Sequence, residues 1–178
     1  DILIEGSRAV ICSDAGLCIY DLEHDVFEVH GISTGLPANR TLTAARHVHD
    51  TTKLLIGFDG GSLMTLSDDK KLEEIETDIL NYRINNLVSD ASFLCFSAIG
   101  EGLYCDEGDG FKHNSLEGAD ELSENFMLNL KSDKNQRLIT LSSDKVLVLK
   151  KALNRQFTVV RKNEGKAISC KDLLVYKD

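Results

Sequence analysis

The sequence GLPANRTLTAARHVHDTTKLLIGFDGGSLMTL, residues 35–66, decides the fold. Short runs rich in aliphatic and β-branched residues alternate in it with turns built from Asp, Gly and Thr, a pattern that predicts antiparallel β-hairpins. The runs and turns follow in this order: a turn (35–37), a strand-like run (41–48), a polar turn (50–52), an apolar run (54–58), a glycine turn (59–61) and a third run (62–66).

The second half of this pattern, an apolar run, a tight turn and another apolar run, occurs four times in the chain. The four copies are VICSDAGLCIYD (10–21), LIGFDGGSLMTL (55–66), CFSAIGEGLYCD (95–106) and LITLSSDKVLVL (138–149). Their turn residues, Gly16, Gly61, Gly102 and Lys145, are 45, 41 and 43 positions apart. A repeat of this length is typical of a four-stranded propeller blade.

Two further strands recur around each copy. A leading strand is predicted at 2–5, 41–48, 84–89 and 126–132, and a trailing strand at 26–30, 72–76, 110–113 and 156–160. Residues 70–79 and 120–130 show some helical periodicity, but both segments are short and lack clean caps, so we interpret them as strands or loops.

The repeat therefore predicts an all-β protein, a β-propeller of about four four-stranded antiparallel blades. We predict blades at approximately 1–34, 35–79, 80–121 and 122–165, with 166–178 supplying the first strand of a further blade. Because an overhanging strand needs a blade to join, we expect the chain to be part of a larger propeller. The chain begins at Asp1 without a Met or a signal segment, which favours a processed product, an expression product or a fragment.

Composition excludes several classes of function. The chain has 178 residues, of which 42% are hydrophobic, enough for a sizeable core, and its net charge is -9. This acidic balance argues against nucleic-acid binding and against binding to anionic membrane surfaces. The longest apolar runs have about half a dozen residues, far fewer than the roughly 20 that a membrane helix needs.

The five cysteines form no zinc-binding spacing. Cys12 and Cys18 flank one predicted turn and Cys95 and Cys105 flank another, so each pair could face across a hairpin. The simpler interpretation, which we prefer, is that they are small buried apolar residues in strands. The odd number of cysteines, with Cys170 as the fifth, leaves the redox compartment open.

The blade opening and the second-strand motif resemble the two-component regulator propeller repeat. Leu36, Pro37 and Asn39 match its Leu-Pro-x-Asn opening, and the family's Leu-Trp-Ile-Gly-Thr-x-x-Gly-Leu motif is matched by Leu55, Ile56, Gly57 and Gly61, in part by Gly102 and Leu103, and by Gly16 and Leu17. The chain departs from the family because it has no Trp and because its fourth repeat lacks the turn glycine.

The resemblance implies the periplasmic sensor region of a membrane-bound hybrid histidine kinase, responding to a carbohydrate fragment. The kinase itself would lie elsewhere, since no kinase, receiver or DNA-binding module is present in these residues. The expected partners are the ligand and either the remaining blades or a second chain, as in a homodimer, with contact to a membrane only through the full-length protein. The alternative is an intracellular (cytoplasmic) propeller that acts as a protein–protein interaction scaffold.

The blade openings are the expected ligand site, because such loops surround the central channel of a propeller. Arg, Tyr and Asn side chains suit sugar hydroxyls and carboxylates, and the arginines are expected to hold any acidic group. The asparagines could instead merely cap turns. The candidate ligand-binding residues are Asn39, Arg40, Tyr82, Arg83, Asn85 and Asn125.

No pattern in the sequence predicts catalysis, a cofactor or a metal site. The nucleophile elbow, the P-loop and the H-E-x-x-H zinc motif are all missing. His47 and His49 would share a face of a strand, but two histidines make an incomplete metal site. The acidic segment 106–110 lacks the spacing and closing Glu of a calcium loop and is read as a solvated turn. Asn39-Arg40-Thr41 fits a glycosylation acceptor, which matters only in a eukaryotic secreted protein.

Overall fold

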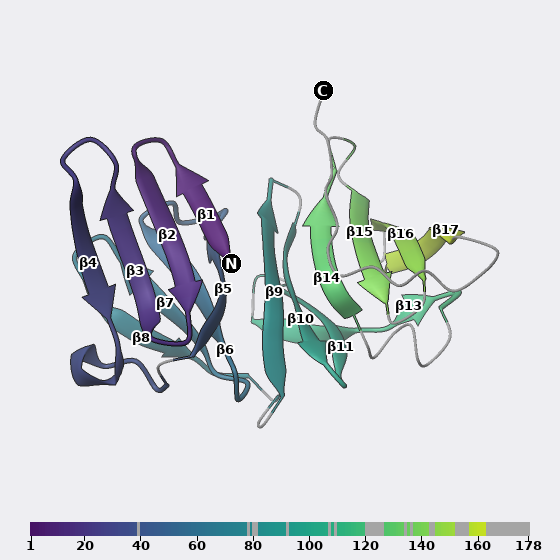
Figure 1. The fold of residues 1–178 in the computed structure, drawn as a ribbon. Coiled ribbons are helices and arrows are strands. Elements are labelled where there is room, and N and C mark those ends of the chain that lie inside the picture. Colours follow the sequence, from purple (N-terminus) through teal and green to yellow (C-terminus); the bar gives the residue numbers. More distant parts are fainter. Residues whose placement is uncertain are drawn as a thin grey trace. The chain divides into compact units, whose positions relative to one another are not determined.

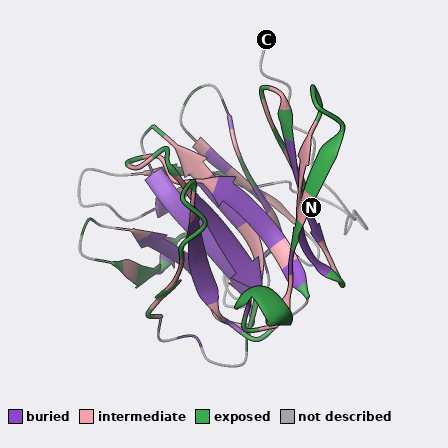
Figure 2. Ribbon diagram, turned by 90° about the vertical axis from the view of Figure 1, so that its left-hand side faces the viewer, coloured by how far each residue is buried: buried purple, intermediate pink, exposed green. Residues whose placement is uncertain are grey.

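The computed structural model is built from β-strands arranged in four sheets, with one short 3-10 turn (Figure 1). It describes residues 1–38, 40–77, 79, 82–91, 93–106, 108, 110–119, 127–133, 135, 137–142, 145–151 and 157–162. In this part of the chain the regular elements are 17 strands and η1 (Ile32–Thr34), which is exposed and green in Figure 2. The predicted strand at 173–176 lies outside the described residues.

The first two sheets are antiparallel meanders in chain order. Blade 1 has the order β1-β2-β3-β4 and blade 2 the order β5-β6-β7-β8. Their strands are β1 (Ile2–Glu5), β2 (Arg8–Ser13), β3 (Gly16–Asp21), β4 (Val26–His30), β5 (Thr41–Arg46), β6 (Lys53–Phe58), β7 (Leu63–Ser67) and β8 (Leu72–Ile75). The segment 70–79, with its partial helical periodicity, thus contains a strand, as predicted.

The third and fourth sheets repeat the same arrangement, with one addition. Their strands are β9 (Arg83–Asp90), β10 (Phe93–Ile99), β11 (Gly102–Asp106), β12 (Phe111–Asn114), β13 (Leu116–Glu117), β14 (Met127–Ser132), β15 (Arg137–Ser142), β16 (Val146–Lys151) and β17 (Phe157–Lys162). Blade 3 has the order β12-β11-β10-β9, and blade 4 joins β14, β15, β16 and β17 in turn. The short strand β13, which no sequence pattern predicted, pairs in parallel with β17 and makes blade 4 five-stranded.

The chain divides into two compact units, Asp1–Leu87 and Val88–Asp178. In the first unit, buried side chains of blades 1 and 2 form one core, which includes Leu17, Ile56 and Phe58. In the second unit the core contains Leu103 and Phe157 and joins blade 3 to blade 4. A four-stranded sheet cannot bury both faces alone, so each unit buries the facing surfaces of a blade pair.

The other face of blade 1 is apolar and is exposed along its edge strands, β1 and β4. Strand register places its side chains in two rows, Ile2-Ile11-Cys18-Val29 and Ile4-Ala9-Tyr20-Phe27. Phe27 is 66% exposed and Ile2 64% exposed. Apolar side chains in continuous rows across a sheet are typical of a surface that another element covers.

The cysteine interpretation was wrong for one pair. Cys95 and Cys105 lie directly opposite each other on β10 and β11 and form a disulfide. Cys12 and Cys18 are free thiols, because the register of β2 and β3 places Cys12 opposite Leu17 instead. Cys170 lies outside the described residues.

These observations confirm the predicted all-β class with four-stranded antiparallel sheets, to one of which β13 adds a short parallel strand.

Candidate functional site

Four charged side chains meet at one end of the first unit, and we call them the four-charge cluster: Asp14, Arg40, Asp59 and Arg83. Each follows or precedes a strand at the same end of its sheet. Asp14 lies in the turn after β2 and Asp59 directly after β6, while Arg40 directly precedes β5 and Arg83 begins β9. The cluster therefore combines two hairpin turns with the two loops that enter β5 and β9.

Asp59 is the centre of the four-charge cluster. Arg40 donates through Nη1 to Asp59 Oδ2 at 2.8 Å, and Arg83 Nε lies 3.0 Å from Asp59 Oδ1. Arg40 Nε also lies 3.0 Å from Oδ1 of Asp14. One carboxylate thus holds two guanidinium groups, and a second carboxylate fixes the orientation of the first of them.

The backbone brings these side chains together. Asp59 and Arg83 form an isolated antiparallel bridge, and the amide of Asp59 donates to the carbonyl oxygen of Arg40 at 3.4 Å. Gly61 lets the turn after β6 lie close to the backbone of Ile79, because a Cβ atom at this position would be only 1.9 Å from the carbonyl oxygen of Ile79. Thr41 ties blade 2 to blade 1, since its hydroxyl donates to the carbonyl oxygen of Gly16 at 2.9 Å.

The four-charge cluster is balanced in charge and open to solvent. It carries two positive and two negative groups, and the side chains of Arg40 and Arg83 are 47% and 46% exposed. Within the described residues, Nη2 of Arg40 and both Nη groups of Arg83 make no hydrogen bond. The cluster therefore offers oriented N–H donors next to carboxylate acceptors, which matches the donors and acceptors of hydroxyl groups.

The structure brings together two of the six predicted ligand residues, Arg40 and Arg83. Tyr82 precedes Arg83 and is 39% exposed, and Asn85 is half-buried on β9. Asn39 and Asn125 lie outside the described residues. Sequence reasoning missed Asp14 and Asp59; the available signal was that each stands in the turn between the second and third strands of its repeat.

The two segments considered as possible metal sites, at 47–49 and 106–110, form turns held by local hydrogen bonds. His47 and His49 follow the end of β5, and Nδ1 of His47 accepts hydrogen bonds from the amides of His49 and Asp50, both at 3.2 Å. Oδ1 of Asp106 accepts from the amides of Gly108 and Gly110 at 2.8 and 3.3 Å. Among the described residues, no group of three or more His, Cys, Asp and Glu side chains could hold a metal ion.

The fold and the four-charge cluster define a β-propeller segment with a charged loop end. No family model matches the sequence, and no curated protein matches it. Among solved structures, the chain is similar to the extracellular domain of BT3049 from B. thetaiotaomicron, a protein described as a hybrid two-component system. The TM-score is 0.69 at 20% identity, over 95% of this chain and 22% of that one.

Two further structures show the same likeness. The extracellular domain of BT4673, also described as a hybrid two-component system of B. thetaiotaomicron, has a TM-score of 0.70 at 16% identity, over 94% of this chain and 22% of that one. The β-propeller domain of Cps50 (Swd1) from Myceliophteria thermophila has a TM-score of 0.68 at 10% identity, over 94% of this chain and 56% of that one. At these identities the similarity establishes the fold. The chain spans about a fifth of the two bacterial extracellular domains.

Proposed function

We propose that this chain is a segment of the ligand-sensing, periplasmic propeller of a hybrid two-component system. The observation that carries the proposal is its fold similarity, over 94–95% of its length, to extracellular domains of proteins described in those terms. The Leu-Pro-x-Asn opening at residues 36–39 supports the same assignment from the sequence. In this proposal the segment is not catalytic, and its signal reaches a kinase module elsewhere in the full-length protein.

The Cys95–Cys105 disulfide supports an extracytoplasmic location. Structural disulfides persist in oxidising compartments such as the periplasm and are rare in the cytosol. This favours the sensor over the alternative of an intracellular interaction scaffold. None of the described residues forms a helix that is long and apolar enough to cross a membrane.

We propose that the four-charge cluster contacts the ligand. An acidic ligand group must compete with Asp59 and Asp14 for the two arginines, whereas a neutral hydroxyl group can add to the existing arrangement. The balanced charge therefore favours a hydroxyl-rich ligand, for which a carbohydrate fragment is the proposed class. This proposal differs from the expectation from sequence, in which Arg40 and Arg83 hold an acidic group of the ligand.

The test is calorimetric titration of the intact sensor with its inducing glycan. Arg40→Ala and Arg83→Ala should each weaken binding about tenfold or more, since a hydrogen bond to a charged group contributes about 1.5–3 kcal/mol. Arg8→Ala is the matched control, because it removes the same charge at the opposite end of the strands of blade 1. Unchanged affinity in both cluster variants would refute this ligand site and leave the sensor proposal intact.

The sensor proposal has its own test in the full-length sequence. A membrane-spanning helix followed by a histidine kinase would support it. Cytosolic domains on both sides of the propeller would refute it and favour the scaffold.

A further inference from the structure

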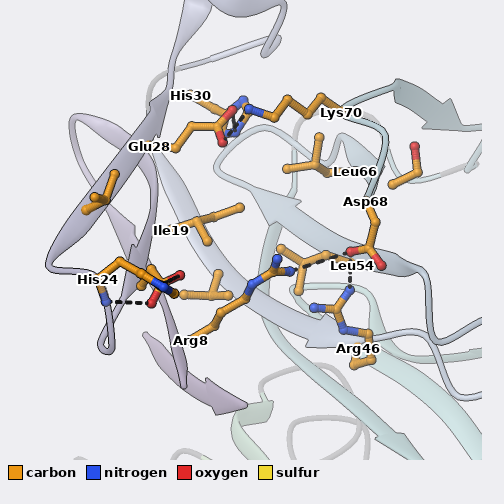
Figure 3. Close-up of a pocket in the computed structure, with 14 residues that line it drawn as sticks. Arg8, Ile19, His24, Glu28, His30, Arg46, Leu54, Leu66, Asp68 and Lys70 are labelled. Carbon is orange, nitrogen blue, oxygen red and sulfur yellow. Dashed lines mark hydrogen bonds and ion pairs between the residues drawn. The ribbon is translucent and has the colours of Figure 1, made fainter. Parts of the chain in front are cut away.

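A cleft of about 380 Å³ opens between blade 1 and blade 2 (Figure 3) and runs along the strands, from Arg8 and Arg46 at the end opposite to the four-charge cluster to His30 at the end of β4. Its walls come from β2, β3 and β4 on one side and from β5, β6, β7 and the turn after β7 on the other. The volume falls within the range of roughly 300–1,000 Å³ that small-molecule sites occupy. The whole cleft belongs to the first unit, Asp1–Leu87.

The floor of the cleft is aliphatic. Val10 and Ile19 are paired across β2 and β3, and Leu54 and Leu66 are paired across β6 and β7. Val10, Leu54 and Leu66 are buried and belong to the core between the two blades. A ligand resting on this floor must therefore present an apolar surface to it.

One end of the cleft carries two arginines that converge on one point. Glu5 holds Arg46 by a forked contact, in which Nε lies 3.0 Å from Oε1 and 3.1 Å from Oε2. This leaves Nη1 of Arg46 directed at Asp68, whose Oδ1 lies 3.6 Å away. Nη1 of Arg8 lies 3.8 Å from the same oxygen. Both distances exceed a hydrogen bond, so Asp68 occupies the convergence point only loosely.

Arg8 is available to a ligand. Its guanidinium makes no hydrogen bond to any residue that the structure describes, and its contact with Asp68 joins two side chains that are each 55% exposed. Exposed ion pairs of this kind contribute little, whereas a charge-assisted hydrogen bond at normal distance is considerably stronger. An anion that takes the place of Asp68 at hydrogen-bond distance would therefore make stronger contacts with Arg8 and Arg46 than Asp68 makes.

The other end of the cleft contains a second unsatisfied group. The His30 side chain is 8% exposed, and its Nε2 atom lies 3.2 Å from Oε1 of Glu28 without a hydrogen bond to any described residue. Glu28 is held at 2.8 Å by Lys70, and this hydrogen bond keeps the pKa of Glu28 below its ordinary value. The contact with Glu28 lacks hydrogen-bond geometry, so a ligand at this cleft wall can supply the hydrogen bond that the buried ring nitrogen does not make.

We propose that this cleft binds a small amphipathic carboxylate, with its carboxylate between Arg8 and Arg46 and its apolar body on the floor formed by Val10, Ile19, Leu54 and Leu66. Asp68 marks the position of the carboxylate and turns outward when the ligand binds. The site lies away from the four-charge cluster and does not depend on the proposed sensor function.

The test uses sodium octanoate and its uncharged counterpart 1-octanol as probes, titrated calorimetrically into the full chain. Octanoate should bind with one site and 1-octanol at least tenfold more weakly. Arg8→Gln should weaken octanoate binding about tenfold through the lost charge-assisted contacts. Asp68→Asn should tighten it severalfold, because a like charge near the carboxylate is removed. Neither substitution should change the binding of 1-octanol.

Arg83→Gln, which neutralises an arginine of the four-charge cluster, is the matched control and should leave octanoate binding unchanged. His24 and His30 both line the cleft. Their ring resonances therefore locate the probe, and both should shift in nuclear magnetic resonance spectra with the same saturation as the heat signal. Circular dichroism checks that each variant is folded. The proposal is overturned if octanoate does not bind, if octanoate and 1-octanol bind equally, or if Asp68→Asn weakens octanoate as Arg8→Gln does.

Discussion

Arg40 and Arg83 form ion pairs with the two different oxygens of one carboxylate, that of Asp59. The two arginines are 43 positions apart, a separation that matches the blade repeat, and each stands at the entry to the leading strand of its blade. The repeat thus delivers equivalent side chains from consecutive blades to the same place. Asp59, in the turn of the first of these blades, fixes the separation of the two guanidinium groups.

Asp59→Asn should lower the free energy of unfolding by about 1 kcal/mol, because two partly exposed ion pairs each contribute up to about that amount. The amide keeps one acceptor oxygen and turns an N–H group toward one arginine, which loses its partner. Urea denaturation measures the change. Asp14→Asn is the control and should have a smaller effect, since Asp14 is 86% exposed and, among the residues that the structure describes, forms an ion pair with Arg40 alone. Equal effects of the two substitutions would contradict the central role of Asp59.

Gly61→Ala should destabilise the chain far more than Gly60→Ala. Both glycines have positive φ angles, so alanine pays a backbone cost of about 1–3 kcal/mol at either position. Only at Gly61 does the new Cβ also collide with a backbone carbonyl, 1.9 Å away, while at Gly60 it meets nothing within 4 Å. We expect Gly61→Ala to cost at least about 2 kcal/mol more, by analogy with overpacking in a core. Matched thermal melts of the two variants measure the difference.

The strands were predictable because each blade repeats the same local signals. Leu55 and Ile56 stand before the Asp59-Gly60-Gly61 turn and Leu63 to Leu66 after it, and similar signals recur at intervals of 41–45 residues. The strand β13 was not predictable, because Leu116 and Glu117 form too short a run to show any periodicity. Its parallel partner on β17 lies 41 positions away, a distance at which local patterns carry no information.

The candidate site was predictable only in part. Arg40 and Arg83 could be placed together because they stand at equivalent points of the repeat. The aspartates could not, since Asp is common in turns for reasons unrelated to function, and nothing local indicates that Asp59 accepts from arginines 19 and 24 positions away. Whether two cysteines face each other across a hairpin depends on the length of its turn, which the sequence pattern did not fix. The two-residue turn Asp14-Ala15 shifts Cys12 away from Cys18, while the three-residue turn 99–101 places Cys95 opposite Cys105.

Removing the disulfide by Cys95→Ser with Cys105→Ser should lower the free energy of unfolding by about 2–3 kcal/mol, as expected for a closed loop of this length. Thermal unfolding with and without reductant measures the effect. Cys18→Ser is the control: it keeps the disulfide, so it should be about as stable as the unchanged chain without reductant and should lose stability on reduction to the same extent. Alkylation of the unreduced, denatured chain should modify Cys12 and Cys18 and spare Cys95 and Cys105. Modification of all four before reduction would contradict the pairing.

Stability should fall at acidic pH in part through Asp133. Burial raises the pKa of this carboxyl, but hydrogen bonds from the Arg137 side chain and from the amides of Arg137 and Asn135 outweigh burial and hold the pKa below its ordinary value. A lowered folded-state pKa stabilises the fold above the unfolded value of about 3.9, and this contribution is lost as the pH falls through the folded value.

Asp133→Asn should therefore be less stable than the unchanged chain at neutral pH and should lose less of its stability below about pH 4. Urea denaturation at a series of pH values measures both effects. Asp14→Asn is the control, because its side chain is 86% exposed and lies outside the Asp133 hydrogen-bond network, and it should leave the pH profile near that of the unchanged chain. Parallel profiles for the unchanged chain and the Asp133 variant would contradict the assignment.

The exposed apolar face of blade 1 should make this chain associate at high concentration. Phe27→Lys places a charge on that face at its β4 edge and should shift the population toward the monomer, because charged groups resist burial. Sedimentation equilibrium at several concentrations measures the shift. Val160→Lys on β17, an exposed apolar residue of the second unit, is the matched control. A chain that is monomeric at all concentrations would refute this role of the face.

The parallel pairing of β13 with β17 has a consequence for the timing of folding during synthesis. Leu116 pairs with Phe157, so β13 leaves the ribosome 41 residues before its partner does. At about 5–20 residues per second, this leaves β13 without that partner for roughly 2–8 s. The pairing of β13 with β17 is therefore the last step in forming that sheet. Until β17 emerges, Leu116 has no strand partner in the nascent chain.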